Sequence, residues 1–394
     1  MSNQGKNINS IELFCGTGGL ALGLHNAGFS HRALYEWDKD SCDNILANIN
    51  GGFAGISDWC IHQTDVRCVS YDGLSESISF VSGGPPCQPF SLGGKAQAHN
   101  DKRDMFPEAV RAVREIKPVA FLFENVKGLT RQSFKEYFDY ILLQLTYPSI
   151  VKEANMTWEE HKAMLVQQQA MSSHQQEYSV QYRVVNAADY GVPQLRYRVI
   201  IVGFRNDITS TWEFPKPTHS KEALLYAKWI TGEYWMKHGL PMPECPLSED
   251  ALKKVKKSVE SGLVPRLPWR TTRDAIGDLP DPRCSEAQHY NNHEYRPGAK
   301  SYPGHSGSSL DEPSKTIKAG AHGVPGGENT VILDSGEVRY YTVRESARIQ
   351  TFPDNYCFSA SWTESMRQIG NAVPVQLAEV VGSSLYDYLR RCEK

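Results

Sequence analysis

Residues 10–20, SIELFCGTGGL, decide the fold, because an apolar strand pattern runs here directly into a glycine-rich turn. The helix expected after the turn has an apolar set of residues: Leu20, Leu22 and Leu24. Glycines at such a turn let backbone N–H groups approach a ligand at a helix N-terminus. The spacing of Gly16, Gly18 and Gly19 departs from the dinucleotide pattern GxGxxG, so NAD is not favoured.

The first two hundred residues alternate short β-rich runs with helical patterns, which predicts a mostly parallel sheet covered by helices. Apolar residues of 106–116 recur at helical spacing, and Pro118 is expected to end this helix. Strands are expected at 10–14, 33–36, 78–81, 119–123, 182–186 and 199–204. The last two are joined by too few residues for a helical crossover, so we expect them to be antiparallel.

Composition is that of an ordinary globular protein, with 40% hydrophobic and 22% charged residues among 394. The net charge of −3 argues against binding of nucleic acid through the overall charge of the chain. Any basic surface that binds nucleic acid must therefore be local. The polar N-terminus and the lack of an apolar run of about 18 residues argue against a secretory signal and a membrane span. The nine cysteines include no CxxC pair, so neither disulfides nor a zinc site are expected.

The amino-acid composition changes near residue 211, where prolines become frequent, and we place a domain boundary there. The polar, Gln-rich segment 147–181 is interpreted as an insertion in the first domain, and 158–171 can form a helix. A dense basic cluster lies at Lys253, Lys254, Lys256 and Lys257. A solvated helix face explains this cluster at least as well as a phosphate contact does.

Three acidic or aromatic positions favour a nucleoside cofactor. Glu36 lies twenty residues after Gly16 at the end of the second strand, where an acid can bind the two hydroxyls of a ribose. Trp37 can lie against an adenine face, and Asp65, at the end of the third strand region, can accept from the exocyclic amine. Each alone is equally typical of a turn or a surface, but their order together indicates a cofactor site.

Cys87 lies in SGGPPCQPFS, residues 82–91, directly after an apolar strand. The glycines and prolines before it prevent a simple continuation of strand or helix, so the cysteine is held at a strand end. Ligands of open α/β sheets bind at that edge, which makes Cys87 a candidate nucleophile. The alternative is a free cysteine that merely packs.

Glu124 leaves the apolar run VAFLF as the start of ENV. Partial desolvation would raise its pKa and suit it to act as an acid near pH 7, although a salt-bridged strand-end acid is equally common. Arg196 and Arg198 follow in QLRYR, and alternation along an extended chain points both to one side. They are candidates to hold an anion, to orient Glu124, or to favour the thiolate of Cys87.

Taken together, these motifs resemble the DNA cytosine-5 methyltransferases, in particular the bacterial restriction-modification enzymes. They occur in the family's order and cover much of residues 10–210 and 338–380. The blocks are FCGTGG, YEWD, TDV, GGPPCQPFS, ENV, QLRYR, RESARIQTFPD (344–354) and QIGNAVPVQLA (368–378). The resemblance implies a Rossmann-like, S-adenosylmethionine-dependent methyltransferase fold, with helices on both faces of the sheet and a smaller target-recognition domain.

The resemblance also implies the reaction and its residues. Cys87 would add to carbon 6 of a flipped-out cytosine, with Glu124 at ring nitrogen 3 and Arg196 and Arg198 assisting. Positions matching the family's S-adenosylmethionine site are Phe14, Gly16, Gly18, Gly19, Glu36, Trp37, Asp65, Val66, Pro86, Asn371 and Val373. Those expected to face DNA are Gln88, Ser91, Arg103 and Thr316, the last within the fragment EPSKTIKAG.

The same resemblance predicts the domains and the partners. Residues 1–211 and 364–394 would form the catalytic domain, and 212–363 the target-recognition domain and hinge. We expect a cytoplasmic monomer, associated with the nucleoid through double-stranded DNA, without a metal and linked to a cognate restriction endonuclease. The segment DKRDMF, 101–106, is one residue shorter than the family pattern, which leaves the roles of Arg103 and Met105 open.

Three other functions fit the sequence less well. A transfer RNA branch of the family has a CFT element, which residues 212–343 lack. A DNA-binding regulator on the same fold would have no need of Cys87, Glu124 and both arginines. A small-molecule methyltransferase would leave the second domain unexplained.

Overall fold

A computed structural model describes residues 8–74, 77–86, 104–171, 176–208, 211–300, 307–319 and 329–392. The contacts between residues divide the protein into two compact units. The first contains Met1–Val185, Tyr197–Phe214 and Val381–Lys394, and the second contains Asn186–Arg196 and Pro215–Val380. These boundaries lie close to residue 211 but place the C-terminal return at 381 instead of 364. The functional division into catalytic and recognition domains stays a prediction.

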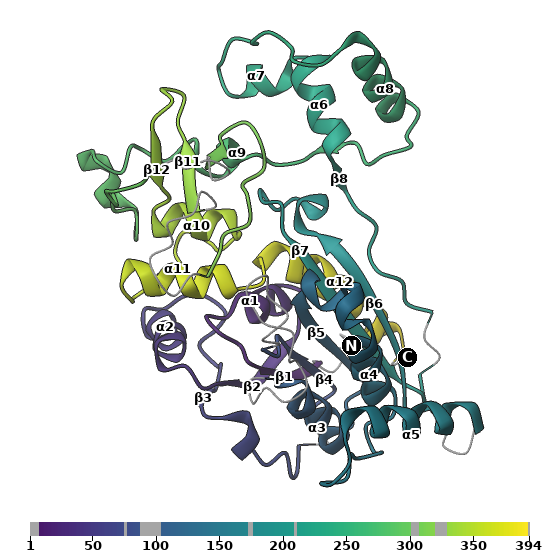
Figure 1. The fold of residues 1–394 in the computed structure, drawn as a ribbon. Coiled ribbons are helices and arrows are strands. Elements are labelled where there is room, and N and C mark those ends of the chain that lie inside the picture. The colour runs from purple at the N-terminus through teal and green to yellow at the C-terminus, as the bar shows by residue number, and fades with distance from the viewer. Residues whose placement is uncertain are drawn as a thin grey trace, which may run out of the picture. The chain divides into compact units, whose positions relative to one another are not determined.

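The first unit is built on a seven-stranded sheet of order β3-β2-β1-β4-β5-β7-β6 (Figure 1). Its strands are β1 (Asn9–Leu13), β2 (Ser30–Glu36), β3 (Ile61–Gln63), β4 (Phe80–Gly83), β5 (Ala120–Val126), β6 (Tyr178–Asn186) and β7 (Tyr197–Arg205). The first five are parallel, whereas β7 runs antiparallel to β5. β6 is the sheet neighbour of β7, and the short connection 187–196 requires these two to be antiparallel as well. The predicted sheet is therefore confirmed.

Helices connect these strands. They are α1 (Gly19–Asn26), α2 (Lys39–Asn50), α3 (Phe106–Ile116), α4 (Lys135–Thr146), α5 (Trp158–Met171), the last part of α12 (Val375–Cys392) and the short η1 (Val66–Cys68), η3 (Lys127–Thr130) and η4 (Gln132–Phe134). α3 has the predicted bounds: it ends where Lys117 turns into the left-handed region, at φ 53°, directly before Pro118. α5 confirms the helix expected in the insertion.

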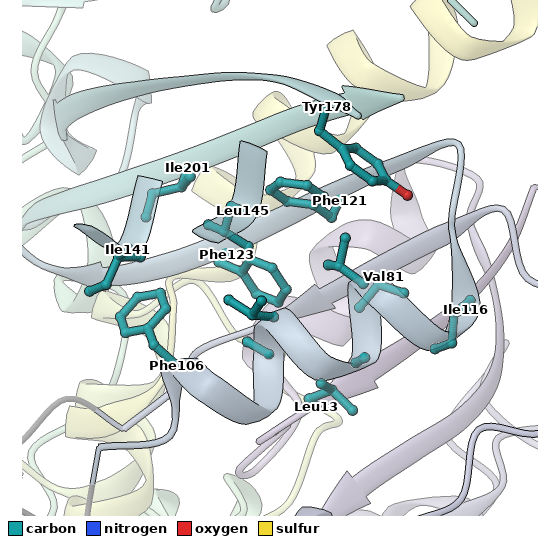
Figure 2. Packing of buried hydrophobic residues seen from close by; sticks show 14 of the residues in the cluster. Leu13, Val81, Phe106, Ile116, Phe121, Phe123, Ile141, Leu145, Tyr178 and Ile201 are labelled. Atoms are coloured by element: carbon teal, nitrogen blue, oxygen red, sulfur yellow. The ribbon is translucent and has the colours of Figure 1, made fainter. Parts of the chain in front are cut away.

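The core of the first unit lies between the sheet and α3 and α4. Figure 2 shows Phe106 and Ile116 of α3 in one apolar cluster with Val81, Phe121 and Phe123 of the central strands. These five side chains are fully buried, and each contributes about 1.5–3 kcal/mol by leaving water. This packing fixes β4 and β5, whose ends are important for the site.

The second unit consists mainly of helices and short strand pairs. It contains α6 (Lys221–Trp229), α7 (Glu233–Lys237), α8 (Glu249–Glu260), α9 (Thr272–Ile276), α10 (Val343–Ile349), α11 (Trp362–Asn371), η5 (Ala187–Tyr190) and η6 (Ser285–His289). β8 (His219–Ser220) pairs with β9 (Leu267–Pro268), and β10 (Ser308–Ser309), β11 (Thr330–Ile332) and β12 (Val338–Tyr340) form a small sheet. Across the described ranges, no helix has the length and apolar character needed to cross a membrane.

Glu12 is an unexpected buried acid in the middle of the sheet. Only 1% of it is exposed, and Ser82 of β4 donates to its Oε2 over 3.1 Å. Burial raises the pKa of Glu12 from 4.5 to about 8. The folded protein therefore holds a proton that the unfolded chain releases between these two values. Because the folded state binds more protons there, the free energy of unfolding must fall as pH rises through that window.

We predict that Glu12→Gln, which cannot ionise, removes this pH dependence. Relative to the variant, the wild type should lose about 1 kcal/mol of unfolding free energy per pH unit between roughly pH 5 and 8. Urea unfolding at several pH values measures this difference. Glu153→Gln, at an exposed position, is the control and should parallel the wild type. Parallel curves for Glu12→Gln as well would contradict the prediction.

Candidate active site

The carboxyl ends of the parallel strands bring several predicted positions into one row. Leu13 of β1 lies opposite Tyr35 of β2 and Gly83 of β4. Gly83 lies in turn opposite Phe123 of β5. The next residue of each strand therefore comes to the same edge of the sheet: Phe14, Glu36, Gly84 and Glu124. This is the edge at which open α/β sheets bind ligands.

The turn between β1 and α1 has an unusual backbone. Phe14, Gly16 and Gly18 all have positive φ, at 56°, 54° and 85°. Phe14 adopts this conformation at a cost of about 1–2 kcal/mol, a strain that is common at ligand sites. A β-carbon added at Gly16 would meet nothing within 4 Å, so the space beside this glycine is open. The turn thus leaves room for a ligand to approach the backbone before α1.

Glu36 holds this turn against β2. Its Oε2 accepts from the Gly16 N–H over 2.8 Å, and its Oε1 accepts from the N–H groups of Trp37 and Asp38 over 2.9 Å. Burial raises the pKa of the Glu36 carboxyl, although these three donors counteract the shift. A carboxylate has about four acceptor positions, so one remains for a ribose hydroxyl. The Trp37 side chain is 73% exposed, which leaves its ring accessible to an adenine.

Asp65 accepts a forked contact from Arg67, whose Nε lies 3.0 Å from both carboxylate oxygens. The Arg67 guanidinium lowers the pKa of Asp65, which keeps it an acceptor at neutral pH. Val66, the next residue, is buried and begins η1. An adenine amine would therefore share the Asp65 carboxylate with Arg67.

Glu124 and Arg198 form a buried ion pair at the other end of the row. Arg198 Nε lies 2.6 Å from Glu124 Oε1, and the two side chains are only 11% and 9% exposed. The antiparallel register places Arg198, at the start of β7, opposite Val126. Burial lowers the pKa of the Arg198 guanidinium, and the charge of Glu124 opposes this shift. Glu124 is therefore both a strand-end acid and a salt-bridged one.

The chain that leads to Cys87 is fixed beside this pair. Asn125 Nδ2 donates to the Pro85 carbonyl over 2.9 Å, and the Met105 N–H donates to the Pro86 carbonyl over 3.2 Å. A β-carbon on Gly84 would lie 3.5 Å from Glu124 Oε2. Asn125 was not assigned a role from the sequence, although its position in ENV next to Glu124 was the available signal. Cys87, Gln88, Ser91 and Arg103 lie outside the described residues.

Arg196 corrects one expectation. It is fully buried in the second unit, where it donates to the carbonyls of Ile317, Gly370 and Ala372 over 3.1, 2.6 and 3.0 Å. The expectation that both arginines of QLRYR face one side for one task is therefore wrong. β7 begins only at Tyr197, so the strand alternation on which the expectation rested does not extend back to Arg196.

The remaining predicted residues of the second unit have different surroundings. Thr316 donates its hydroxyl to the Leu195 carbonyl over 2.6 Å. Asn371 is exposed at the end of α11, and Val373 is 6% exposed. The ligand contacts expected of these residues stay predictions. Within the described part of the chain, no three His, Cys, Asp or Glu side chains gather to hold a metal ion.

Comparisons with known proteins identify the family of this chain. The family described as C-5 cytosine-specific DNA methylase matches residues 8–147 and 155–387. The chain belongs to this family. It is 33% identical to Type II methyltransferase M.PspPI of Psychrobacter sp., over 99% of this chain and 81% of the relative. Type II methyltransferase M.NgoMIV of Neisseria gonorrhoeae is 30% identical over 98% of this chain and 99% of its own length.

The fold is also that of solved methyltransferases. The crystal structure of S. pombe Dnmt2 methyltransferase superimposes with a TM-score of 0.57 at 15% identity, covering 98% of this chain and 99% of that one. The mixed sheet is thus the S-adenosylmethionine-dependent methyltransferase fold. As a member of the family, the protein methylates cytosine in DNA with S-adenosylmethionine as methyl donor. The transfer RNA and regulatory alternatives are not favoured.

We predict that Gly16→Ala weakens binding of S-adenosylmethionine at least fivefold in calorimetry, because the side chain strains the turn and fills the open space beside it. Gly52→Ala is the matched control, since Gly52 also has positive φ, at 77°, and open space around it. Both substitutions should lower the free energy of unfolding by about 1–2 kcal/mol. Equal cofactor affinity in the two variants would show that the turn at Gly16 is not a cofactor site.

Proposed function

We propose that the protein methylates carbon 5 of a cytosine within a specific duplex DNA sequence through a covalent intermediate on Cys87. The observation that carries this proposal is the buried pair of Glu124 and Arg198 beside Gly84, Pro85 and Pro86, the residues that lead to the cysteine. The pair supplies an acid of fixed orientation at the strand edge. Cys87 comes directly after Pro86 in the sequence, and we propose it as the nucleophile.

The chemistry requires such an arrangement. Carbon 5 of cytosine is too weak a nucleophile to take a methyl group directly, so the Cys87 thiolate first adds to carbon 6. Glu124 stabilises the resulting enamine at ring nitrogen 3 and the exocyclic amine, while Arg198 orients the carboxyl group. Carbon 5 would then take the methyl group, with S-adenosylhomocysteine as the leaving group. Loss of the carbon 5 proton to solvent breaks the bond from carbon 6 to sulfur, and the electron pair of that bond returns to the Cys87 thiolate. This restores the aromatic ring and frees Cys87.

The residues at the other end of the row fit S-adenosylmethionine, which supplies the methyl group when it is bound. The turn from Phe14 to Gly19 offers an open backbone, Glu36 has an acceptor left for a ribose, and Trp37 exposes a ring for adenine. Asp65 and Val66 are proposed to hold the adenine amine and ring, with Pro86, Asn371 and Val373 as further contacts.

The DNA substrate is proposed to enter with the target base flipped out of the helix, since carbon 6 cannot be reached inside a stacked duplex. Gln88, Ser91, Arg103 and Thr316 are proposed as DNA contacts. The Type II relatives favour a role in restriction and modification. The protein would then protect host DNA from a cognate restriction endonuclease and work as a monomer in the bacterial cytoplasm, without a metal.

We predict that Cys87→Ala abolishes methylation of DNA while S-adenosylmethionine binds with affinity within twofold of the wild type. Bisulfite sequencing of DNA from expressing cells identifies the target site, and tritiated methyl transfer to a duplex with that site measures the activity. Cys60→Ala is the control, because Cys60 is exposed and is distant from Cys87 in the sequence. A duplex with 5-fluorocytosine at the target should trap the wild type but not Cys87→Ala. Turnover by Cys87→Ala would refute the mechanism.

We further predict that Glu124→Gln lowers kcat by about 10²–10⁴-fold, the range expected for loss of an acid that acts in the transition state. Single-turnover methylation with enzyme in excess measures this change independently of product release. Binding of S-adenosylmethionine should stay within twofold, since Glu124 lies at the opposite end of the row from Glu36. An unchanged single-turnover rate would remove Glu124 from the mechanism.

A further inference from the structure

Lys228 of α6 is an unusual residue, because its side chain is only 3% exposed in the second unit. Lysine is almost never fully buried without compensating partners. The Lys228 ammonium lies 5.7, 5.5 and 5.8 Å from the ring centres of Trp229, Tyr234 and Trp235. At these distances the rings stabilise the charge through their π faces. The Lys228 ammonium group therefore lies inside an aromatic cage formed by these three rings.

The ammonium group is directed at one segment of the chain. It donates to the Asp311 carbonyl over 2.6 Å and pairs with Glu312 Oε1 at 2.7 Å. Tyr234, a member of the cage, donates its hydroxyl to Asp311 Oδ1 over 2.8 Å. The cage and its cation thus bind Asp311 and Glu312 together.

The same segment is held from a second side by α9. The side-chain Nε of Arg273 donates to Asp311 Oδ1 over 2.7 Å, and the backbone N–H of Arg273 donates to the Leu310 carbonyl over 2.7 Å. The N–H and the hydroxyl of Thr272 both donate to the Glu312 carbonyl, over 2.8 and 2.9 Å. Residues 310–312 therefore have little freedom to move relative to α6 and α9.

Four residues further on, the chain reaches Thr316 and Ile317. Ile317 N–H donates to Gln194 Oε1 over 2.9 Å, and the Thr316 hydroxyl binds the Leu195 carbonyl. Between them, the Ser314 N–H donates to the Pro193 carbonyl over 2.9 Å, so only Pro313 separates these attachments from Glu312. Any shift of Glu312 must therefore be taken up within the residues that precede Thr316.

We propose that Lys228 is a positioning residue for target recognition: through Glu312 and Asp311 it fixes the segment that presents Thr316 to DNA. The proposal rests on the proposed function, because it assigns a role within DNA recognition. Burial of a paired lysine is a poor way to gain stability, since an apolar side chain in the same cage is often as stable or more so. The charge is retained for its direction toward Glu312.

The test compares Lys228→Met with Lys228→Arg and Glu312→Gln. Methionine keeps the length of the side chain and packs among the rings without a charge, and Glu312 is half exposed, so it can be solvated when its partner is lost. Binding to a duplex with the target site and to a duplex with one altered base pair is measured by fluorescence anisotropy. Methylation kinetics and the spectrum of methylated sites in cells are measured in parallel.

We expect Lys228→Met to bind the target duplex at least tenfold more weakly, to lose discrimination against the altered duplex, and to raise KM for DNA with kcat within twofold. Glu312→Gln should act in the same direction, and Lys228→Arg should restore discrimination to within threefold of the wild type. Lys221→Met, at an exposed lysine of the same helix α6, is the matched control and should behave as the wild type. Cofactor affinity should be unchanged in all four variants.

Wild-type discrimination by Lys228→Met would overturn the proposal. So would a folded Lys228→Met in which DNA affinity falls equally for both duplexes, because the charge would then act only on general binding. A variant that unfolds and loses cofactor binding would assign Lys228 to stability alone. Failure of the wild type to methylate DNA would instead refute the proposed function, whereas methylation by the wild type with unchanged discrimination by Lys228→Met would refute only the role of Lys228.

Discussion

The site depends on the close approach of β4 to β1 at Gly83. A β-carbon at this position would lie 2.6 Å from the Leu13 carbonyl oxygen, a distance at which real β-carbons essentially never lie from another atom. Only glycine therefore allows the two parallel strands to keep their register up to the edge of the sheet. If β4 moved away from β1 by even part of an ångström, Gly84 and the prolines after it would move away from Phe14. The row of positions from Glu36 to Glu124 would then no longer be continuous.

The ion pair of Glu124 and Arg198 is better explained by function than by stability. Removing two charges from water costs several kcal/mol per ion, and apolar residues in place of a buried pair are often as stable or more so. Here the pair lies at the end of β5 and the start of β7, at the edge where open α/β sheets bind ligands. The arrangement keeps a carboxyl group in one orientation while leaving its Oε2 close to Gly84. Stability in this part of the sheet comes instead from residues such as Phe121 and Phe123.

The sequence allowed most of the first unit to be predicted, because its signals are local. Periodicity and Pro118 were enough for α3, and apolar runs located the main strands. Local signals could not show that Arg196 and Arg198 have different partners. This difference depends on Leu195, whose N–H binds the Ser314 carbonyl over 2.8 Å, a contact between residues more than a hundred positions apart. The cage around Lys228 is invisible for the same reason, since lysines usually signal a solvated surface.

Many polar residues of the second unit are buried because they bind the backbone of an irregular segment. The segment from Leu310 to Ile317 contains no regular helix or strand, so its backbone groups cannot pair with one another as they would in a sheet. Each must find a partner elsewhere, and side chains supply many of them: Gln194, Arg196, Lys228 and Thr272. Gly370 contributes by its lack of a side chain, since a β-carbon there would lie 2.4 Å from the Ala319 nitrogen. An irregular segment held in this way has a fixed shape without a fixed secondary structure. That property suits a recognition element, because a rigid irregular segment presents its side chains in one fixed arrangement.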